Sequence, residues 1–410
     1  MEQVYYFIII FALLFEYFLS TTSSFLDIRN ISEEVPSGFK DVYDTEKYSK
    51  SQNYLKEKTR FGIISGTFSL LLMLIVIHIG LFGNLDQYVR SYTEHPILSG
   101  LLFFGLIFIF QDLLSLPFTF YNTFILEERF GFNRTTIKTF LVDKVKSYSL
   151  IIVLGSLIMT PILYFFQILG PSGWWIAWIM ITLFIIGIQP LFVHVIAPMF
   201  NKFTPLERGE LRSAIEDYSK KVQFPINRVD VMDGSKRSAH SNAYFSGFGK
   251  SRRIALFDTL LDKHSTEEII SVVAHEVGHY KKKHIIKGTI LGVVEIGLML
   301  FVFNLIMTDK ALFSVFGVSD ISVHAGLIFF SMLYSPVSMV TSFFTAAYSR
   351  KNEFEADAYS LETTKNPKAL VSMLKGLAAN NLAHLTPHPL KVYLSYSHPP
   401  VKDRIAAISQ

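Results

Sequence analysis

The stretch His275-Glu276-Val277-Gly278-His279 places two histidines four residues apart, with an acidic residue directly after the first. On an α-helix, residues four apart share a face, so both imidazole rings can direct a nitrogen at one metal ion. Glu276 then lies within reach of a water at that metal and can accept its proton. The pattern predicts a catalytic zinc site built into a helix.

The surrounding residues favour a buried helix. Two histidines and an acid at this spacing also occur by chance on solvated helix faces, but Val272, Val273 and Ala274 make this helix largely apolar. Upstream, the stretch from Ser265 to Glu268 has the sequence of a capping box, which predicts where the helix begins. The polar residues of the motif therefore need a function on an otherwise apolar helix.

A catalytic zinc ion takes three protein ligands and keeps one position open, so a third ligand must come from elsewhere in the chain. The best candidate segment is 349–357, with the sequence SRKNEFEAD. Glu353 and Asp357 are four residues apart and therefore share a helix face. One could bind zinc while the other accepts the N–H of a ligating histidine. Glu353 is the predicted third ligand, and Glu355 is the alternative.

The composition indicates a membrane protein. Half of the 410 residues are hydrophobic, with 38 Phe and 19 Tyr, and the mean hydropathy is +0.36. A soluble domain of this size rarely carries so much apolar mass. The absence of cysteine excludes disulfides, thiolate zinc ligands and a cysteine nucleophile. The net charge of +4 comes without a basic stripe, so we expect no nucleic-acid partner.

Seven segments are long and apolar enough to cross a bilayer, which takes about 20 residues. They are 4–20, 62–83, 98–125, 148–169, 174–199, 286–307 and 323–347. Nearly all Lys and Arg residues lie in 21–61, 126–147, 200–285 and 348–410, whereas the expected loops 84–97, 170–173 and 308–322 are nearly free of them. Because basic segments stay cytoplasmic, we expect an outside N-terminus and two cytoplasmic polar segments.

The expected fold is therefore mainly α, a seven-helix transmembrane bundle with a metalloprotease domain that contains a small sheet. We divide the chain into a five-span region (1–199), a first catalytic part (200–285), a two-span hairpin (286–347) and a second catalytic part (348–410). The last two membrane helices thus split the catalytic domain. Its first part should open with an amphipathic helix capped at Thr204 and reaching Val222. Strands should follow at 228–232, 241–246 and 253–257, with a turn at 247–250.

Further strings extend the motif into a family resemblance. They are EERFGFN at 127–133, SNAYF at 241–245 and YSHPP at 396–400. Together with HEVGH and NEFEAD, they resemble the type I CAAX prenyl proteases, integral-membrane zinc metalloproteases of the gluzincin group. The resemblance implies one zinc ion held by His275, His279 and Glu353, with Glu276 as general base and Asp357 orienting a ligand.

The resemblance also implies how substrate is bound. Asn242 and Ala243 would belong to an edge strand that pairs with an extended peptide, although an ordinary hairpin strand is the alternative. His398 would approach the scissile carbonyl oxygen, unless it is a turn histidine held by two prolines. Arg404 is a further candidate for substrate contact. The implied reaction removes the C-terminal tripeptide after a prenylated cysteine, with lipidated or membrane-associated peptides as partners.

Three acidic residues fall within predicted spans, namely Glu16, Asp112 and Glu295. Each could line the water-filled chamber that the family encloses or bond to a neighbouring helix. His284 follows His279 by five residues, off the ligand face, and is expected at the membrane edge. The stretch 127–133 is expected to be architectural.

Two other classes of protein compete with this interpretation. Quality-control metalloproteases of the HtpX type share the zinc motif, but they have fewer spans and lack the long N-terminal helical half. A transporter-like protein with a vestigial metal site, or a scaffold with an inactive protease domain, would leave Glu276 without a role. We expect a monomer in the bilayer, in the endoplasmic reticulum of a eukaryotic cell or the inner membrane of a bacterium.

Overall fold

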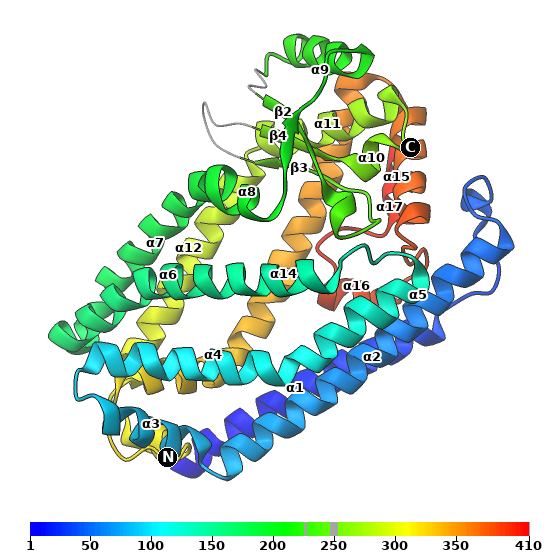
Figure 1. Ribbon diagram of the computed structural model, residues 1–410. Coiled ribbons are helices and arrows are strands. Elements are labelled where there is room, and N and C mark those ends of the chain that lie inside the picture. Colours follow the sequence, from blue (N-terminus) through cyan, green and yellow to red (C-terminus); the bar gives the residue numbers. More distant parts are fainter. Residues whose placement is uncertain (225–227, 247–252, 410) are drawn as a thin grey trace.

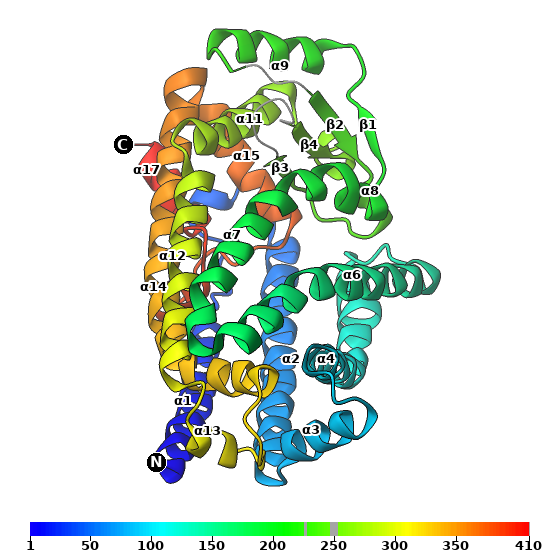
Figure 2. The same ribbon diagram turned by 90° about the vertical axis from the view of Figure 1, so that its left-hand side faces the viewer.

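The computed structural model describes residues 1–224, 228–246 and 253–409 and is predominantly helical (Figure 1). In two perpendicular views, long helices form the larger part of the molecule, and a smaller part with a sheet lies above one end of them (Figures 1 and 2). The long apolar helices are α1 (Glu2–Arg29), α2 (Thr45–His78), α4 (Pro96–Tyr121), α6 (Ile137–Leu169), α7 (Trp174–Leu191), α12 (His284–Ile306) and α14 (Val323–Thr364).

Shorter helices complete both parts. Those of the upper part are α9 (Glu210–Lys221), α10 (Asp258–Leu261), α11 (Thr266–Lys281), α15 (Pro367–Asn380) and α17 (Val401–Ile408), whereas α16 (Pro389–Ser395) packs against α1 and α14. Those that join or extend the long helices are α3 (Leu81–Tyr92), α5 (Glu128–Phe130), α8 (Ala197–Phe200), α13 (Lys310–Ser314), the π-helices η2 (Asn122–Glu127) and η4 (Phe192–Ile196), and the 3₁₀ turn η3 (Gly170–Gly173).

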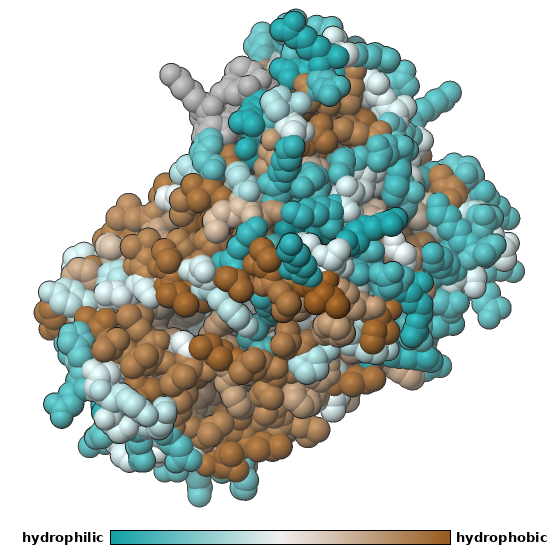
Figure 3. All heavy atoms as spheres, in the orientation of Figure 1, coloured by the Kyte–Doolittle hydropathy of each residue, from teal (hydrophilic) through white to brown (hydrophobic). Residues whose placement is uncertain are grey.

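The long helices turn apolar side chains outward, as a lipid-facing surface does. On α1, Phe7, Phe11 and Phe18 are each about two-thirds exposed. Brown, apolar residues cover the part formed by the long helices, whereas teal, polar residues cover much of the upper part (Figure 3). Such an exposed apolar surface is stable only against lipid, so the chain is an integral membrane protein.

Six ranges of the described residues are long and apolar enough to span a membrane. They are Glu2–Arg29, Thr45–His78, Pro96–Phe130, Ile137–Phe200, His284–Ile306 and Val323–Thr364. Each predicted span lies in one of these ranges, except that 62–83 runs five residues past His78 and 286–307 runs one residue past Ile306. The fourth range contains two of them, because α6 and α7 are joined by η3 without an extended break. The count of seven therefore stays a prediction.

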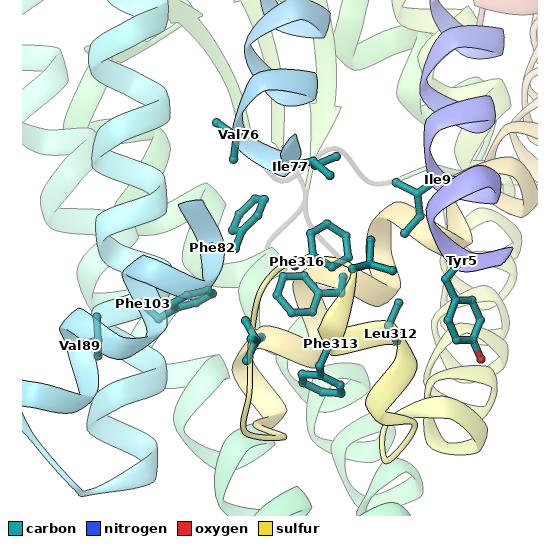
Figure 4. Close-up of a cluster of buried hydrophobic side chains, with 14 residues drawn as sticks. Tyr5, Ile9, Val76, Ile77, Phe82, Val89, Phe103, Leu312, Phe313 and Phe316 are labelled. Atoms are coloured by element: carbon teal, nitrogen blue, oxygen red, sulfur yellow. The ribbon is translucent and has the colours of Figure 1, made fainter. Parts of the chain in front are cut away.

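An aromatic cluster closes the end of the bundle that lies farthest from the sheet (Figure 4). Phe316 stacks on Phe329 at 3.9 Å between ring centroids, and Phe82 of α3 packs edge-on against both. The segment 84–97, expected as a connection between two spans, is largely helical here, because α3 covers most of it. Its apolar face, with Phe82 and Val89 buried, completes the cluster.

The sheet has four strands in the order β1-β2-β4-β3, so β3 is an edge strand. They are β1 (Phe203–Pro205), β2 (Arg228–Met232), β3 (Ala243–Ser246) and β4 (Arg253–Phe257). The predicted strands over 228–232 and 253–257 are confirmed, and they pair in parallel. β3 pairs with β4 antiparallel. The predicted turn over 247–250 lies outside the described residues.

The predicted helix start at Thr204 was wrong. Thr204 and Pro205 lie in β1, which pairs antiparallel with β2, and α9 begins only at Glu210, after Gly209. Proline lacks an N–H and is tolerated on an edge strand, so the residue that resembled a helical N1 proline ends a strand instead. The apolar face of the helix is as expected, with Ile215 and Tyr218 buried.

Two helices bring the predicted site together. α11 begins with the predicted capping box, in which Ser265 and Glu268 each accept the other's backbone N–H. α14 is one helix of 42 residues, about 63 Å long, so the last predicted span continues without a break into Glu353 and Asp357. The helices cross where Gly278 of α11 meets Ala356 of α14.

We expect the substitution Gly278→Ala to destabilise the protein by about 1–3 kcal/mol, because the added methyl group overpacks this crossing. An ideal Cβ at Gly278 would lie 3.1 Å from Ala356 Cα and 3.2 Å from its carbonyl oxygen, and a backbone neighbour cannot rotate away. Thermal unfolding in detergent measures the change. Gly292→Ala on α12, where nothing lies within 4 Å, is the matched control and should be neutral or slightly stabilising. Equal stability of both variants would contradict the expectation.

Candidate metal centre and active site

The structure brings together the three predicted zinc ligands. His275 and His279 of α11 and Glu353 of α14 each offer one ligand atom, and these atoms lie within 4.8 Å of one another. The two Nε2 atoms are 3.1 Å apart, and the Glu353 oxygens lie 3.3 Å from Nε2 of His279 and 3.5 Å from Nε2 of His275. His275 and Glu353 are buried, whereas His279 is partly exposed. Glu355, the alternative third ligand, is not in this cluster.

The chemistry of the cluster fits a metal cation. Nδ1 of His275 is 2.9 Å from Asp357 Oδ1, and a carboxylate can only accept, so the neutral ring keeps its Nε2 lone pair for the cluster. Oε2 of Glu353 is buried and has no hydrogen-bond partner among the described residues. Lone pairs and a carboxylate oxygen converging in a buried site are costly without a cation. A tetrahedral zinc ion with N and O ligands matches this donor set.

A salt bridge with Arg404 holds the carboxylate of Asp357 in place next to the cluster. Arg404 donates from Nε to Asp357 Oδ2 at 2.7 Å and from Nη2 to Oδ1 at 2.6 Å. Burial lowers the pKa of His275, but hydrogen bonds to Asp357 and Glu353 outweigh burial and raise that pKa to about 9. The carboxylates therefore favour a positive charge at this position, whether a proton or a metal ion carries it.

The Arg404 side chain is only 11% exposed, and its guanidinium group contacts the carboxylates of Asp357 and Glu353. Its predicted contact with substrate stays a prediction. Sequence spacing gave no sign of the ion pair, because α17 lies almost fifty residues after Asp357.

Glu276, the predicted general base, lies next to the edge strand. Its Oε2 accepts the backbone N–H of Phe245 in β3 at 3.3 Å. β3 is bonded to β4 on one side only, and Asn242 lies exposed just before it, with Oδ1 accepting the N–H of Ala243 at 2.8 Å. An unpaired strand edge presents backbone groups that an extended peptide can bind.

His398 is a solvent-exposed residue next to the cluster. It lies in the turn between α16 and α17, its side chain is 65% exposed, and its Nε2 is 3.3 Å from Glu353 Oε1. Nδ1 is 3.0 Å from Ser397 Oγ. An exposed imidazole in contact with a predicted ligand can reach a group bound at the site.

His284, expected at the membrane edge and not as a ligand, is the first residue of the candidate span α12, and its side chain is buried beside the cluster. Its Nδ1 is 3.0 Å from His279 Nδ1, and its Nε2 is 3.1 Å from Glu355 Oε2. Helical spacing could not predict this contact, because residues five apart do not share a helix face. Lys283, in the left-handed region with φ 60°, separates α11 from α12 and turns the chain so that His284 faces His279.

The stretch 127–133 packs against the segment that leads into β3. Glu127 accepts hydrogen bonds from Tyr54 at 2.7 Å and Lys58 at 3.2 Å, and its Oε2 is 3.6 Å from His240 Nε2. The ring of Phe132 stacks on His240 with 3.9 Å between centroids. β3 begins at Ala243, three residues after His240. The stretch 127–133 therefore supports the segment that leads into the edge strand, which agrees with the architectural role expected for it.

The three acidic residues within the spans have different surroundings. Asp112 of α4 accepts from Lys144 and Tyr148 of α6, and Glu295 of α12 accepts from Thr341 of α14, so both are interhelical partners. Glu16 lines a cavity of about 370 Å³. Glu16 thus faces a cavity.

Comparison with known proteins covers both halves of the chain. Residues 25–202 match the family model "CAAX prenyl protease N-terminal, five membrane helices", and residues 205–410 match peptidase family M48. CAAX prenyl protease 1 of Saccharomyces cerevisiae is 33% identical, over 93% of this chain and 90% of that protein. The homologue from Dictyostelium discoideum is 35% identical, over 98% and 96%. The crystal structure of S. mikatae Ste24p superposes with a TM-score of 0.91 and 32% identity over 98% of each chain.

Apolar spanning helices and a His-His-Glu cluster beside an acid define an integral-membrane metallopeptidase. The chain belongs to the CAAX prenyl protease 1 family within peptidase family M48. The resemblance drawn from the five short strings is therefore confirmed.

Proposed function

We propose that this protein is a zinc endopeptidase that removes the C-terminal tripeptide after a prenylated cysteine in CAAX proteins. The observation that carries the proposal is the cluster of His275, His279 and Glu353 within 4.8 Å, next to a strand edge that can bind a peptide. The substrate class comes from the names of the relatives, which are CAAX prenyl proteases. One zinc ion would be held by these three side chains.

In the proposed peptide hydrolysis, each residue of the site has a separate role. Zinc, when bound, would lower the pKa of a water and polarise the substrate carbonyl. Glu276 accepts the proton of the attacking water and passes it to the leaving amine. His398, exposed beside Glu353, donates a hydrogen bond to the developing negative charge on the carbonyl oxygen. Asp357, held by Arg404, keeps the ring of His275 in its ligating tautomer.

Substrate would bind as a further strand on β3. Asn242 and Ala243 begin this edge, and the N–H of Phe245 that now bonds to Glu276 faces the same side. Backbone pairing selects chain direction and length more than side chains, which suits a reaction that releases a fixed tripeptide. Arg404 Nη1, 3.5 Å from Glu353, is the guanidinium nitrogen that could also reach substrate.

We infer seven spans and the division into 1–199, 200–285, 286–347 and 348–410. The range Ile137–Phe200 has 64 residues, about 96 Å as a helix, whereas the hydrocarbon core is about 30 Å thick. α6 and α7 pack against each other around Phe166 and Ala177, as two antiparallel spans do. Charge alternation supports a cytoplasmic protease domain. The membrane would be the endoplasmic reticulum in a eukaryote or the inner membrane in a bacterium, and the protein a monomer.

The competing classes have less support. A quality-control protease of the HtpX type does not account for the match of residues 25–202 to the CAAX prenyl protease N-terminal model. A transporter-like protein with a vestigial metal site does not account for Glu276 beside the edge strand.

We expect Glu276→Gln to lower turnover by about 10²–10⁴-fold while leaving zinc content and fold intact, because it removes a proton acceptor and no ligand. Peptide cleavage and elemental analysis of the same purified sample measure both effects. Glu353→Ala is the control and should lose zinc and activity together. Substantial hydrolysis by the Gln variant would show that another group activates the water.

We expect the protein to cleave a farnesylated CAAX peptide directly after the modified cysteine and to cleave its unprenylated twin much more slowly. The lipid would hold the peptide at the membrane with its C-terminus extended along β3. Mass spectrometry of the products locates the cut. Equal cleavage of both peptides at scattered bonds would favour a broad-specificity membrane protease and leave the zinc chemistry unaffected.

A further inference from the structure

We propose that His284 and Glu355 form a hydrogen-bond relay that fixes His279 in its zinc-binding tautomer and orientation. The proposal rests on the zinc site proposed above and assigns a role to two residues outside it. In this arrangement each histidine ligand has its own carboxylate. Asp357 serves His275 directly, and Glu355 serves His279 through His284.

The three side chains form a continuous chain of contacts. Oε2 of Glu355 is 3.1 Å from His284 Nε2, and His284 Nδ1 is 3.0 Å from His279 Nδ1. The remaining nitrogen, His279 Nε2, lies in the ligand cluster, 3.3 Å from Glu353 Oε1. The His284 side chain is only 4% exposed, so water does not compete freely for its nitrogens.

The direction of these hydrogen bonds follows from what each group can donate. An ionised carboxylate only accepts, so Nε2 of His284 carries the proton that bonds to Glu355. A neutral imidazole protonated at one nitrogen accepts at the other, so His284 Nδ1 accepts from His279 Nδ1–H. Nε2 of His279 is then left with a lone pair directed into the cluster. Without the relay, His279 would exchange between two tautomers, and only one of them can bind the metal through Nε2.

The backbone explains why these two residues meet. The left-handed conformation of Lys283 ends the α11 helix and starts α12, which places His284 against the side of His279 away from Glu353. Glu355 is two residues after Glu353 on α14, and residues two apart point to different sides of a helix. Glu353 therefore reaches the cluster while Glu355 reaches His284. The relay links α11, α12 and α14 at one point.

Zinc affinity and cobalt spectroscopy of the full-length protein in detergent test the relay. The metal-free protein is titrated with zinc against a chromophoric chelator, and separately with Co²⁺, whose visible absorption reports ligand geometry. The variants are His284→Phe, Glu355→Ala and the conservative Glu355→Gln, whose amide oxygen can still accept from His284. Lys351→Ala is the matched control, because Lys351 lies 3.9 Å from Glu355 and takes no part in the relay.

We expect His284→Phe and Glu355→Ala to weaken zinc binding about 10–100-fold and to alter the Co²⁺ spectrum. Glu355→Gln and Lys351→Ala should stay within about threefold of wild type, since both keep an acceptor for His284. Unchanged affinity and spectrum in His284→Phe and Glu355→Ala would overturn the relay. If His284→Phe does not fold, the comparison of Glu355→Ala with Glu355→Gln decides, because Glu355 is 36% exposed. Failure of the wild type to bind zinc would overturn the zinc site and the relay together.

Discussion

The close contact between α11 and α14 at Gly278 is the constraint on which the site depends. Two predicted ligands lie on one helix and the third on the other, so the distance between the helices sets the size of the cluster. Gly278 lies between His275 and His279, and its missing side chain lets Ala356 approach. A metal site tolerates errors of only about half an ångström, so a small residue at this position serves the ligand geometry as well as the packing.

Both helices that form this contact are continuous with membrane-spanning segments. α11 is followed directly by α12, and α14 runs from the far end of the bundle to the cluster as one continuous helix (Figure 1). The site is therefore supported by helices that also hold the protein in lipid. In the proposed reaction, a lipid-anchored peptide would meet the site through the edge of β3. The aromatic cluster at the opposite end, around Phe316, ties α1 to α4 and α13.

Local and periodic signals in the sequence predicted most of the site. The four-residue spacing of His275 and His279 and the capping box at Ser265 depend on neighbours within a few turns, and the structure contains both. The apolar lengths of the spans are local in the same way, and six long apolar ranges account for most of them. Features that depend on tertiary contacts were missed. The segment at Thr204 became a strand because β2 pairs with it, and α3 formed where its apolar face could be buried. The contact of His284 with His279 was missed because one left-handed residue, Lys283, changes the direction of the chain.

Anomalous X-ray diffraction at the zinc absorption edge, from crystals of the zinc-loaded protein, tests the central claim most directly. The account predicts one strong peak per chain, at about 2.0–2.2 Å from Nε2 of His275, Nε2 of His279 and a carboxylate oxygen of Glu353. His284 and Glu355 should border the site without touching the metal. A peak coordinated by His284 or Glu355, or no peak between α11 and α14, would contradict it.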